Sequence, residues 1–535
     1  MVKVPGHDSC DKLCKKYIDH MKTSRLILSI AVILLLAGSC KNDTPATTSL
    51  PRSTPEAEGV SSEAIITFLD SAATSQHEFH SFMFLRHGKV IAEGWWNPYK
   101  SDLRHTLYST SKSFTSTAVG FAVSEKLLTV NDKVISFFPD QLPDSISPFL
   151  ADMTVRDLLT MSAGQSPEPT ATIRSSGDNW IKAFLATPVV NDPGSTFLYN
   201  SMATYMLSAI VQKVTGEMII DYLKPRLFDP LAIEGMDWEV SPEGINTGGW
   251  GLRVKTEDMA KFGQLYLQKG KWNGKQVIPA GWVEEATTFK IDQAPDALQS
   301  KKDSSDWMQG YCYQFWRCRN DAFRADGAYG QFIIVMPEKD AVIAITAESP
   351  DMQNEINMAW KYLLPAMKDE PLPENSKAAE TLKQRLSSLA LPLPAKVPES
   401  PVAALVSSKT YVLENNDQRF ESFSVKFSGD TCILSINADK TDYIIPFGAG
   451  KWTIAETAMA GPNILSGPGA ISLNKTAGSY TWIDDNTLEL VLRYIESPHS
   501  IKVTCVFDKE NVEIIIHLSI PPGDDLPTIK GKMVK

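Results

Sequence analysis

The stretch from Leu107 to Glu125 most limits what this chain can fold into, because its pattern predicts a helix that is apolar or small on most faces. A helix without a polar face has to be buried, with other elements packed around it. A strand hairpin is predicted before it, from Phe82 to Trp96, and a second strand pair follows later, from Tyr311 to Arg317 and from Gly330 to Thr346. Helical patterns alternate with loops in between. This order predicts an α+β domain in which helices flank a sheet.

A second, smaller domain is predicted near the C-terminus. A polar helical stretch from Glu374 to Leu389 and a run of prolines up to Pro401 give residues 366–402 the composition of a semi-rigid linker. Beyond it, short alternating runs are separated by Gly, Asn and Asp turns, which is typical of antiparallel strands. We therefore expect residues 403–535 to form a small antiparallel β-domain, of which a barrel is one form. The clearest runs are Phe423–Phe427, Cys432–Ile436, Thr487–Tyr494 and Val512–Leu518.

The N-terminal region has the layout of a secretory signal. Lys22 and Arg25 precede an apolar run from Leu26 to Gly38, which is shorter than the roughly 20 residues that cross a bilayer. We expect residues 21–39 to be a signal that is removed. Residues 1–20 fit no part of a signal, so we expect them to be an untranslated upstream extension, with Met21 as the true start.

Cys40 follows Leu36, Ala37, Gly38 and Ser39, a run that resembles a bacterial lipobox. The resemblance implies that Cys40 is lipidated and becomes the new N-terminus, and a plain cleaved signal is the alternative. Residues 40–55 are then a flexible tether, order begins near Glu63, and the catalytic domain spans residues 56–365. The expected product is an exported lipoprotein of the cell envelope, at the outer membrane or facing the periplasm. It would touch a membrane only through its lipid anchor.

Charge and cysteine spacing exclude several functions. A formal net charge of -11 argues against binding to nucleic acid or to an anionic membrane. The spacing of Cys312 and Cys318 matches no zinc pattern, although a disulfide between them stays open because an exported compartment is oxidising. We expect the protein to need no metal and no cofactor.

The residues from Ser109 to Lys112 form a Ser-x-x-Lys motif, the strongest candidate for chemistry. The same spacing recurs from Ser9 and from Ser472, so the motif alone decides nothing. Ser9 lies upstream of the signal, and on a strand a separation of three residues would place Ser472 and its lysine on opposite faces. Only Ser109 begins a helix, where the Lys112 amine can lie beside the hydroxyl and the helix N-terminus favours negative charge. The alternative, a capping serine with a solvated lysine, is disfavoured by the apolar helix.

Several blocks, in order along the chain, resemble one known family. The block from Leu107 to Thr115 is similar to the first motif of class C-like serine beta-lactamases and penicillin-binding proteins, relatives of which are esterases, D-amino-acid peptidases and amide hydrolases. The resemblance continues through Met153 to Gly164, Pro193 to Ser201 and Gly248 to Leu252, and covers residues 55–365. It implies a beta-lactamase/DD-peptidase-like fold, with an antiparallel sheet flanked by helices and an all-helical subdomain. It also implies that Ser109 is transiently acylated.

The resemblance implies roles for further residues. Tyr199 matches the tyrosine of the family's Tyr-x-Asn motif and would form a base system with Lys112, since a nearby ammonium favours the phenolate. The alternative is that Tyr199 is a core residue. Ser201 stands where the family has Asn, and its hydroxyl would do part of the work of that amide. The backbone N–H groups of Ser109 and Ala328 would hold the oxyanion.

The third family motif is the largest departure. Its basic and hydroxyl residues are replaced by Ala325 and Asp326, ahead of Gly327, against which a substrate would lie. Without the basic residue a substrate carboxylate has no partner, and Asp326 would repel it unless Arg324 compensates, which disfavours beta-lactam hydrolysis. Asp326 is interpreted either as favouring neutral or amine-bearing substrates, or as a side chain that points to water or pairs with Arg324.

Two further patterns are weaker candidates. Gly248 to Gly251 is similar to the family's glycine loop beside the site, and no Gly-Lys-Ser/Thr follows it, which disfavours nucleotide binding. Trp95 and Trp96 have the chemistry to stack on a sugar, although after a strand such residues are more often core.

The sequence thus predicts a serine hydrolase that cleaves an ester or amide bond in a small molecule or short peptide. A D-amino-acid-specific cell-wall peptidase or a beta-lactamase is the alternative within that class. A surface binding protein with weak or no catalysis is the alternative from another class.

Overall fold

The structure, a computed structural model, describes Met1 and residues 49–534 apart from 176, 178, 463–472, 521, 522 and 524. The predicted extension and signal, the proposed lipid site at Cys40 and residues 41–48 of the predicted tether lie outside the described residues. The end of that tether differs from expectation. Leu50 is buried and Arg52 pairs with Val90 as a β-bridge, so ordered packing starts well before Glu63.

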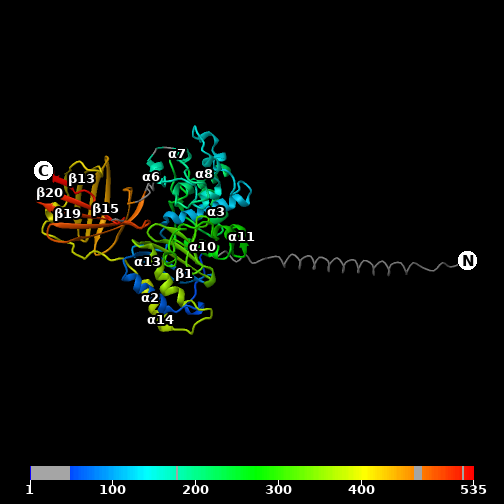
Figure 1. Cartoon of the computed structure of the whole chain (residues 1–535). Coiled ribbons are helices and arrows are strands. Elements are labelled where there is room, and N and C mark those ends of the chain that lie inside the picture. The colour runs from blue at the N-terminus through cyan, green and yellow to red at the C-terminus, as the bar shows by residue number, and fades with distance from the viewer. Residues whose placement is uncertain are drawn as a thin grey trace. The chain divides into compact units, whose positions relative to one another are not determined.

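A six-stranded sheet forms the centre of the domain predicted to be a hydrolase, which we call the hydrolase domain. The strand order is β2-β1-β11-β10-β9-β8, and β1 is labelled in Figure 1. Every pairing in it is antiparallel. The hairpin predicted from Phe82 to Trp96 is present, and its turn at His87 and Gly88 has positive φ at both residues, the geometry that joins two twisted strands most tightly. The predicted strand segment that starts at Gly330 forms two strands, β10 and β11, which pair with each other. The strand β9 was not predicted, whereas Tyr311 to Arg317 is a strand only in its last two residues. The bounds are β1 (Glu78–Arg86), β2 (Lys89–Trp95), β8 (Trp316–Arg317), β9 (Phe323–Gly327), β10 (Gln331–Met336) and β11 (Ala341–Glu348).

Helices cover both faces of this sheet because its strands are apolar on both sides. Successive strand residues point to opposite faces, so Met83 lies in one core and its neighbour Phe84 in the other. The helix α10 (Thr256–Leu267) packs on β1, β10 and β11 in the first core. The helix α2 (Ser62–Ala73) packs on the opposite side, where Phe68 contacts Phe82 at 4.9 Å between ring centroids. The predicted α+β class is confirmed.

The helix predicted from Leu107 to Glu125 is present as a single turn followed by α3 (Ser111–Ser124). Every residue of α3 from Ser111 to Ala122 is buried, as expected for a helix without a polar face. It packs against α8 (Ser201–Thr215), which in turn packs on α5 (Val155–Leu159). This helical layer carries the nucleophile motif on one helix and the tyrosine motif at the start of another.

The stretch predicted as part of a linker packs on the hydrolase domain. The helix α14 (Ser376–Ser387) contacts α2 and β2, and its residues Ala378 and Leu382 are buried. The helix itself was predicted correctly. Its mostly polar composition suggested a linker, but its few apolar residues lie on one face, and that face packs on the domain. The hydrolase domain therefore extends beyond residue 365.

In the described part of the C-terminal β-domain ten strands form one sheet, in the order β15-β14-β13-β12-β21-β20-β19-β18-β17-β16. A short parallel pairing between β15 and β17 closes the sheet on itself, which gives the predicted barrel. Alternate residues of β14 are buried, the pattern of a strand with one face inward. The bounds are β12 (Lys409–Leu413), β13 (Phe420–Ser428), β14 (Thr431–Ala438), β15 (Thr441–Ala449), β16 (Thr453–Thr457), β17 (Asn474–Trp482), β18 (Thr487–Tyr494), β19 (Ser500–Asp508), β20 (Asn511–Leu518) and β21 (Ile529–Met533).

The loop between β18 and β19 joins the barrel to the hydrolase domain. Glu496 forms ion pairs with Arg253 at 3.1 Å and with Arg104 at 3.3 Å, and its backbone oxygen accepts from the N–H of Thr106 at 2.9 Å. At the adjoining end of β18, Arg493 donates to Glu78 at 2.9 Å. The loop is thus fixed against the segment that leads into the nucleophile motif.

Cys312 and Cys318 are separate buried thiols, so the disulfide left open above is not formed. Of the helices in the described part of the chain, none has the length and apolarity needed to cross a membrane.

Candidate active site

Ser109 lies in the single turn from Tyr108 to Thr110 that precedes α3, and it is half-buried. The turn is tied down on two sides. The N–H of Leu107 donates to the Leu252 oxygen at 2.9 Å, and the Thr110 hydroxyl donates to the backbone oxygen of Gln331 at 2.7 Å. These bonds hold the candidate nucleophile between the helical layer and the sheet.

Lys112 projects from the first turn of α3 and is 1% exposed. Its amine donates to the hydroxyls of Ser109 and Ser201, both at 3.1 Å, and to the Gly249 oxygen at 2.6 Å. Burial lowers the pKa of this amine to about 7, and the negative charge of Glu168 opposes that shift only in part. A substantial fraction of the amine is therefore neutral at pH 7 and can accept a proton.

Tyr199 precedes α8, and its side chain hydrogen-bonds with that of Ser109. The Lys112 amine lies 4.9 Å from the centre of its ring. Burial raises the pKa of the Tyr199 phenol well above its ordinary value, and the hydrogen bond with Ser109 opposes this. The direction is opposite to our expectation of a favoured phenolate, because desolvation disfavours the charged form. Tyr199 is thus a neutral phenol suited to relaying a proton, and Lys112 is the stronger base.

Ser201 is the first residue of α8, where its hydroxyl accepts from Lys112. The neighbouring Asn200 caps the same helix, its side-chain oxygen accepting from the N–H of Met202 at 2.9 Å. The two residues have separate tasks: Asn200 starts the helix, and Ser201 takes the contact with lysine that an asparagine amide has in the family motif.

Asp326 does not face water. Its carboxylate is 9% exposed and pairs with the fully buried guanidinium of Arg324 at 2.8 Å. Burial raises the pKa of Asp326, and the charge of Arg324 counteracts that effect. Arg324 in turn lies over the ring of Trp307, 4.3 Å from its centre. Of the readings offered for Asp326, pairing with Arg324 is the one the structure shows, and the neighbouring Ala325 is buried and apolar.

Gly327 ends β9 directly against the nucleophile turn. A Cβ atom at this position would lie 2.2 Å from the Leu107 oxygen and 3.0 Å from the Thr110 hydroxyl. Only glycine fits so close an approach. The next residue, Ala328, begins the turn between β9 and β10, one residue beyond this contact with the nucleophile turn. This placement suits the expected pair of oxyanion donors, the N–H groups of Ser109 and Ala328.

Sequence reasoning missed three groups at this site. The glycine loop was recognised, but not that the Gly249 oxygen holds the Lys112 amine. Glu355 lies beneath the turn that carries Ala328, since a Cβ atom at Gly330 would come within 2.0 Å of its carboxyl oxygen. His499, from the barrel, reaches the residue before the nucleophile. No local signal marks either side chain, because both arrive from distant segments.

Of the other two Ser-x-x-Lys copies, the structure describes only the lysine of the second. Lys475 lies on β17 and its partly exposed amine pairs with Glu496 at 3.4 Å, while Ser472 and the copy at Ser9 lie outside the described residues.

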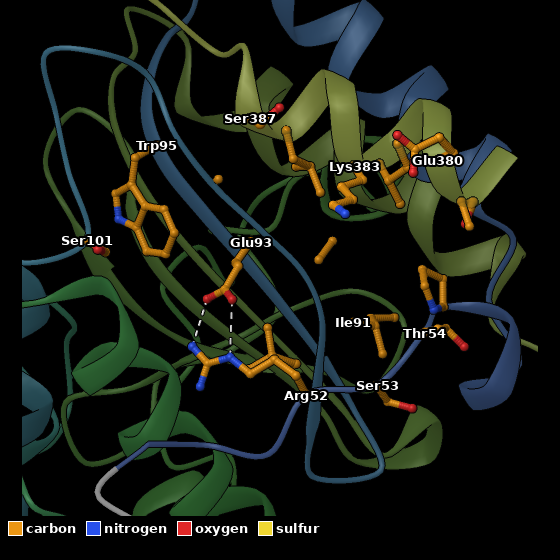
Figure 2. Close-up of a pocket in the computed structure, with 18 of the residues that line it drawn as sticks. Arg52, Ser53, Thr54, Ile91, Glu93, Trp95, Ser101, Glu380, Lys383 and Ser387 are labelled. Atoms are coloured by element: carbon orange, nitrogen blue, oxygen red, sulfur yellow. Dashed lines mark hydrogen bonds and ion pairs between the residues drawn. The ribbon is translucent and has the colours of Figure 1, made fainter. Parts of the chain in front are cut away.

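A cavity of about 920 Å³ lies away from Ser109, between β2 and α14 (Figure 2). Arg52 pairs with Glu93 on one wall, and Lys383 projects from α14 on the other. Trp95 lines this cavity, whereas Trp96 is buried and stacks on Phe79 with 5.6 Å between ring centroids. The tryptophan pair is therefore divided, one residue at the cavity and one in the core.

A Ser-x-x-Lys pair with a buried lysine, at the start of a helix beside an antiparallel sheet and with a tyrosine in contact with the serine, defines the serine hydrolases of the beta-lactamase and penicillin-binding protein class. Residues 77–366 match the family model described as Beta-lactamase. The chain belongs to the beta-lactamase family, and it is a serine hydrolase.

Individual relatives indicate how broad that family is. The 6-aminohexanoate-dimer hydrolase of Paenarthrobacter ureafaciens is 26% identical over 289 residues, which are 51% of this chain and 73% of the relative. The protein named beta-lactamase from Escherichia coli strain K12 is 21% identical over 307 residues, 48% of this chain and 78% of the relative. A solved structure from Bacillus anthracis, a candidate 6-aminohexanoate-dimer hydrolase, aligns with a TM-score of 0.50 at 20% identity, over 61% of this chain and 89% of that one.

Proposed function

We propose that this protein is an exported serine hydrolase that cleaves an ester or amide bond through an acyl-enzyme on Ser109. One observation carries the proposal: the Lys112 amine lies 3.1 Å from the Ser109 hydroxyl, is buried, and has its pKa lowered to about 7. An amine that is partly neutral at pH 7 and touches the nucleophile is a general base in position.

The reaction follows from these contacts. Neutral Lys112 accepts the hydroxyl proton as the Ser109 oxygen attacks the substrate carbonyl carbon. The electron pair of the C=O π bond moves to the carbonyl oxygen, which accepts hydrogen bonds from the N–H groups of Ser109 and Ala328. When the tetrahedral intermediate collapses, Tyr199 passes the proton held by Lys112 to the leaving alcohol or amine. Water then attacks the acyl-enzyme with the same base accepting its proton. The acid is released and the Ser109 hydroxyl is restored.

The strand β9, which carries the third family motif, argues against a substrate with a carboxylate next to the scissile bond. Ala325 offers no charge, and the Arg324 guanidinium is fully buried against Asp326. A beta-lactam carboxylate would therefore find no cation on β9. A linear amide, the class of bond that the Paenarthrobacter relative's name implies, needs no such partner, and neither does a simple ester.

Mass spectrometry of the intact protein tests the proposal. After exposure to a fluorophosphonate we expect one adduct on the parent and none on Ser109→Ala, with 6-aminohexanoate dimer or a 4-nitrophenyl ester turned over and penicillin left intact. Ser124→Ala is the matched control, because Ser124 lies at the other end of α3 and its hydroxyl donates to the Phe121 oxygen of the same helix at 2.8 Å. Labelling that is absent from the parent, or retained by Ser109→Ala, would overturn the enzyme mechanism. Rapid penicillin turnover would overturn the substrate class.

Export rests on the sequence between Met21 and Cys40. Expression of the full chain in a Gram-negative host, followed by fractionation and sequencing of the mature N-terminus, tests it. We expect a blocked N-terminus at Cys40 in the membrane fraction, and a soluble exported protein from Cys40→Ala. Full-length protein in the cytoplasm, beginning at Met1, would contradict both export and the assigned start.

A further inference from the structure

His499, in the loop between β18 and β19 of the barrel, is fully buried against the hydrolase domain. Its Nε2 atom lies 2.6 Å from the hydroxyl of Tyr108, and its Nδ1 atom lies 2.6 Å from a carboxylate oxygen of Glu348. A carboxylate beside Nδ1 favours the tautomer that carries its proton there. Nε2 then accepts from the phenol, and the three side chains form one directed chain of hydrogen bonds.

The same imidazole also contacts Tyr329. The two rings meet edge to face with 4.9 Å between centroids, and Tyr108 and Tyr329 lie 5.8 Å apart in a similar arrangement. The three rings thus form a cluster, contributed by the nucleophile turn, by the turn between β9 and β10, and by the barrel.

The positions of the two tyrosines in sequence give this cluster its meaning. Tyr108 directly precedes Ser109, and Tyr329 directly follows Ala328, so the cluster holds the neighbour of each proposed oxyanion donor. Both tyrosines have left-handed backbone, with φ of 46° and 64°. A bulky residue in that region is strained by roughly 1 kcal/mol or more and stays there only when its surroundings fix it.

The loop that presents His499 is itself well fixed. The N–H of Tyr494 donates to the His499 oxygen at 3.1 Å, which closes the loop, and the Tyr99 hydroxyl donates to the Ser497 oxygen at 2.9 Å. The Ser519 hydroxyl from the barrel donates to the same Glu348 oxygen that His499 contacts, at 2.7 Å. The imidazole therefore has a defined position relative to both turns.

We propose that His499 is a positioning residue for the oxyanion hole, so that the barrel completes the active site of the hydrolase domain. The inference rests on the proposed acyl-enzyme function. By holding Tyr108, His499 fixes the peptide unit that carries the Ser109 N–H. By holding Tyr329, it fixes the residue directly after Ala328, whose own N–H belongs to the Gly327–Ala328 unit. Loss of the imidazole would leave Ser109 and Lys112 intact but allow those donors to drift from the geometry that the transition state requires.

Steady-state kinetics with the ester or amide that the parent turns over test this. We expect His499→Ala to lower kcat roughly ten- to hundredfold, while KM changes less than about threefold. This loss of kcat should not exceed the loss caused by removing a whole oxyanion donor. Fluorophosphonate should still label Ser109, more slowly. Tyr108→Phe removes only the phenol oxygen and should lower kcat by roughly threefold or more. The double variant should be no worse than His499→Ala alone, since both changes break one chain.

Two controls separate positioning from simple domain attachment. His517→Ala removes the barrel's other described histidine, whose Nδ1 lies 3.0 Å from Asp525 in a partly exposed pair. Glu496→Gln weakens the ion pairs of the same loop without touching the ring cluster. Both should keep kcat within about twofold of the parent.

The outcomes are distinct. Parental kcat in Tyr108→Phe, a change confined to KM in His499→Ala, or an equal loss of kcat in Glu496→Gln would each overturn the proposal. If His499→Ala does not fold, as unfolding midpoints would reveal, Tyr108→Phe decides. A parent that is neither labelled nor active would instead overturn the proposed function.

Discussion

The amine of Lys112 lies 3.1 Å from the hydroxyl of Ser109, and the two residues belong to consecutive helical turns, the single turn before α3 and the first turn of α3. Residues three apart on a helix are neighbours, so the contact follows from local geometry. The surroundings make that contact useful. The lysine has three oxygen partners but no carboxylate in contact, so burial is free to lower the pKa of its amine.

The pH dependence of the reaction should report this amine. Because Lys112 must be neutral to accept the serine proton, kcat/KM is expected to rise with pH through about 7, the pKa of its amine, and then to level off. A stopped assay from pH 5 to 9 on an uncharged ester measures it. A rise of kcat/KM centred near pH 10 instead of 7 would mean that the base is a lysine of ordinary pKa.

Stability should carry the same signature. Between about pH 7 and the ordinary lysine pKa of 10.5 the unfolded chain binds a proton that the folded chain has lost, so the parent's free energy of unfolding gains a term that rises with pH. In Lys112→Met this term is absent. Denaturant unfolding at several pH values should show the difference, parent minus variant, growing by about 1.4 kcal/mol per pH unit. A constant difference would contradict the lowered pKa.

The ion pair of Arg324 and Asp326 lies at the site, and we also expect it to contribute to the stability of the fold. Asp326→Ala leaves a fully buried guanidinium without its partner, and we expect a loss of about 3–5 kcal/mol in the free energy of unfolding. The control is Asp439→Ala, which breaks an ion pair with Arg419 whose side chains are 75% and 68% exposed, and it should change stability by less than about 0.5 kcal/mol. Equal effects would show that Asp326 is not committed to Arg324.

Glu355 should destabilise the fold as pH rises. Burial raises the pKa of its carboxyl well above its ordinary value of 4.5, so above that pH the unfolded chain releases a proton that the folded chain keeps. The free energy of unfolding then falls by about 1.4 kcal/mol per pH unit from this group until the folded pKa is reached. Glu355→Gln should remove that slope and be more stable than the parent at pH 8. Glu338→Gln, at an exposed turn residue, should leave the slope unchanged.

The features that could be predicted from the sequence are those that depend on residues close together along the chain. The helix after Ser109, the turn at His87 and Gly88 and the alternating strands of the barrel all depend on patterns within about ten residues, and each is present. The contact between Ser109 and Lys112 is of the same kind. The family resemblance also predicted that Tyr199 and Gly327 lie at the site, although they are far from Ser109 in sequence, because a family motif identifies segments that meet in the fold.

What failed depended on surroundings that no local pattern records. The phenol of Tyr199 was expected to ionise beside a cation, but its burial outweighs that charge. The pairing of Asp326 with Arg324, one of the two interpretations offered, is present, but only the fold shows that both side chains are buried. His499 lies 390 positions from Ser109, too far for any pattern to connect them. These are effects of packing, which the sequence encodes only through the whole fold.

The antiparallel pairing of β1 with β11 has a consequence for how the chain is made. Residues 78–86 pair on one edge with the adjacent β2, but the other edge finds its partner only at residues 341–348, so this edge leaves the ribosome long before it can be covered. At about 5–20 residues per second, the wait is roughly 15 to 50 seconds. During that interval the apolar run from Phe79 to Leu85 is exposed on a growing chain. Synthesis of this protein therefore passes through a stage at which a chaperone, or a second nascent copy, can bind the strand before β11 does.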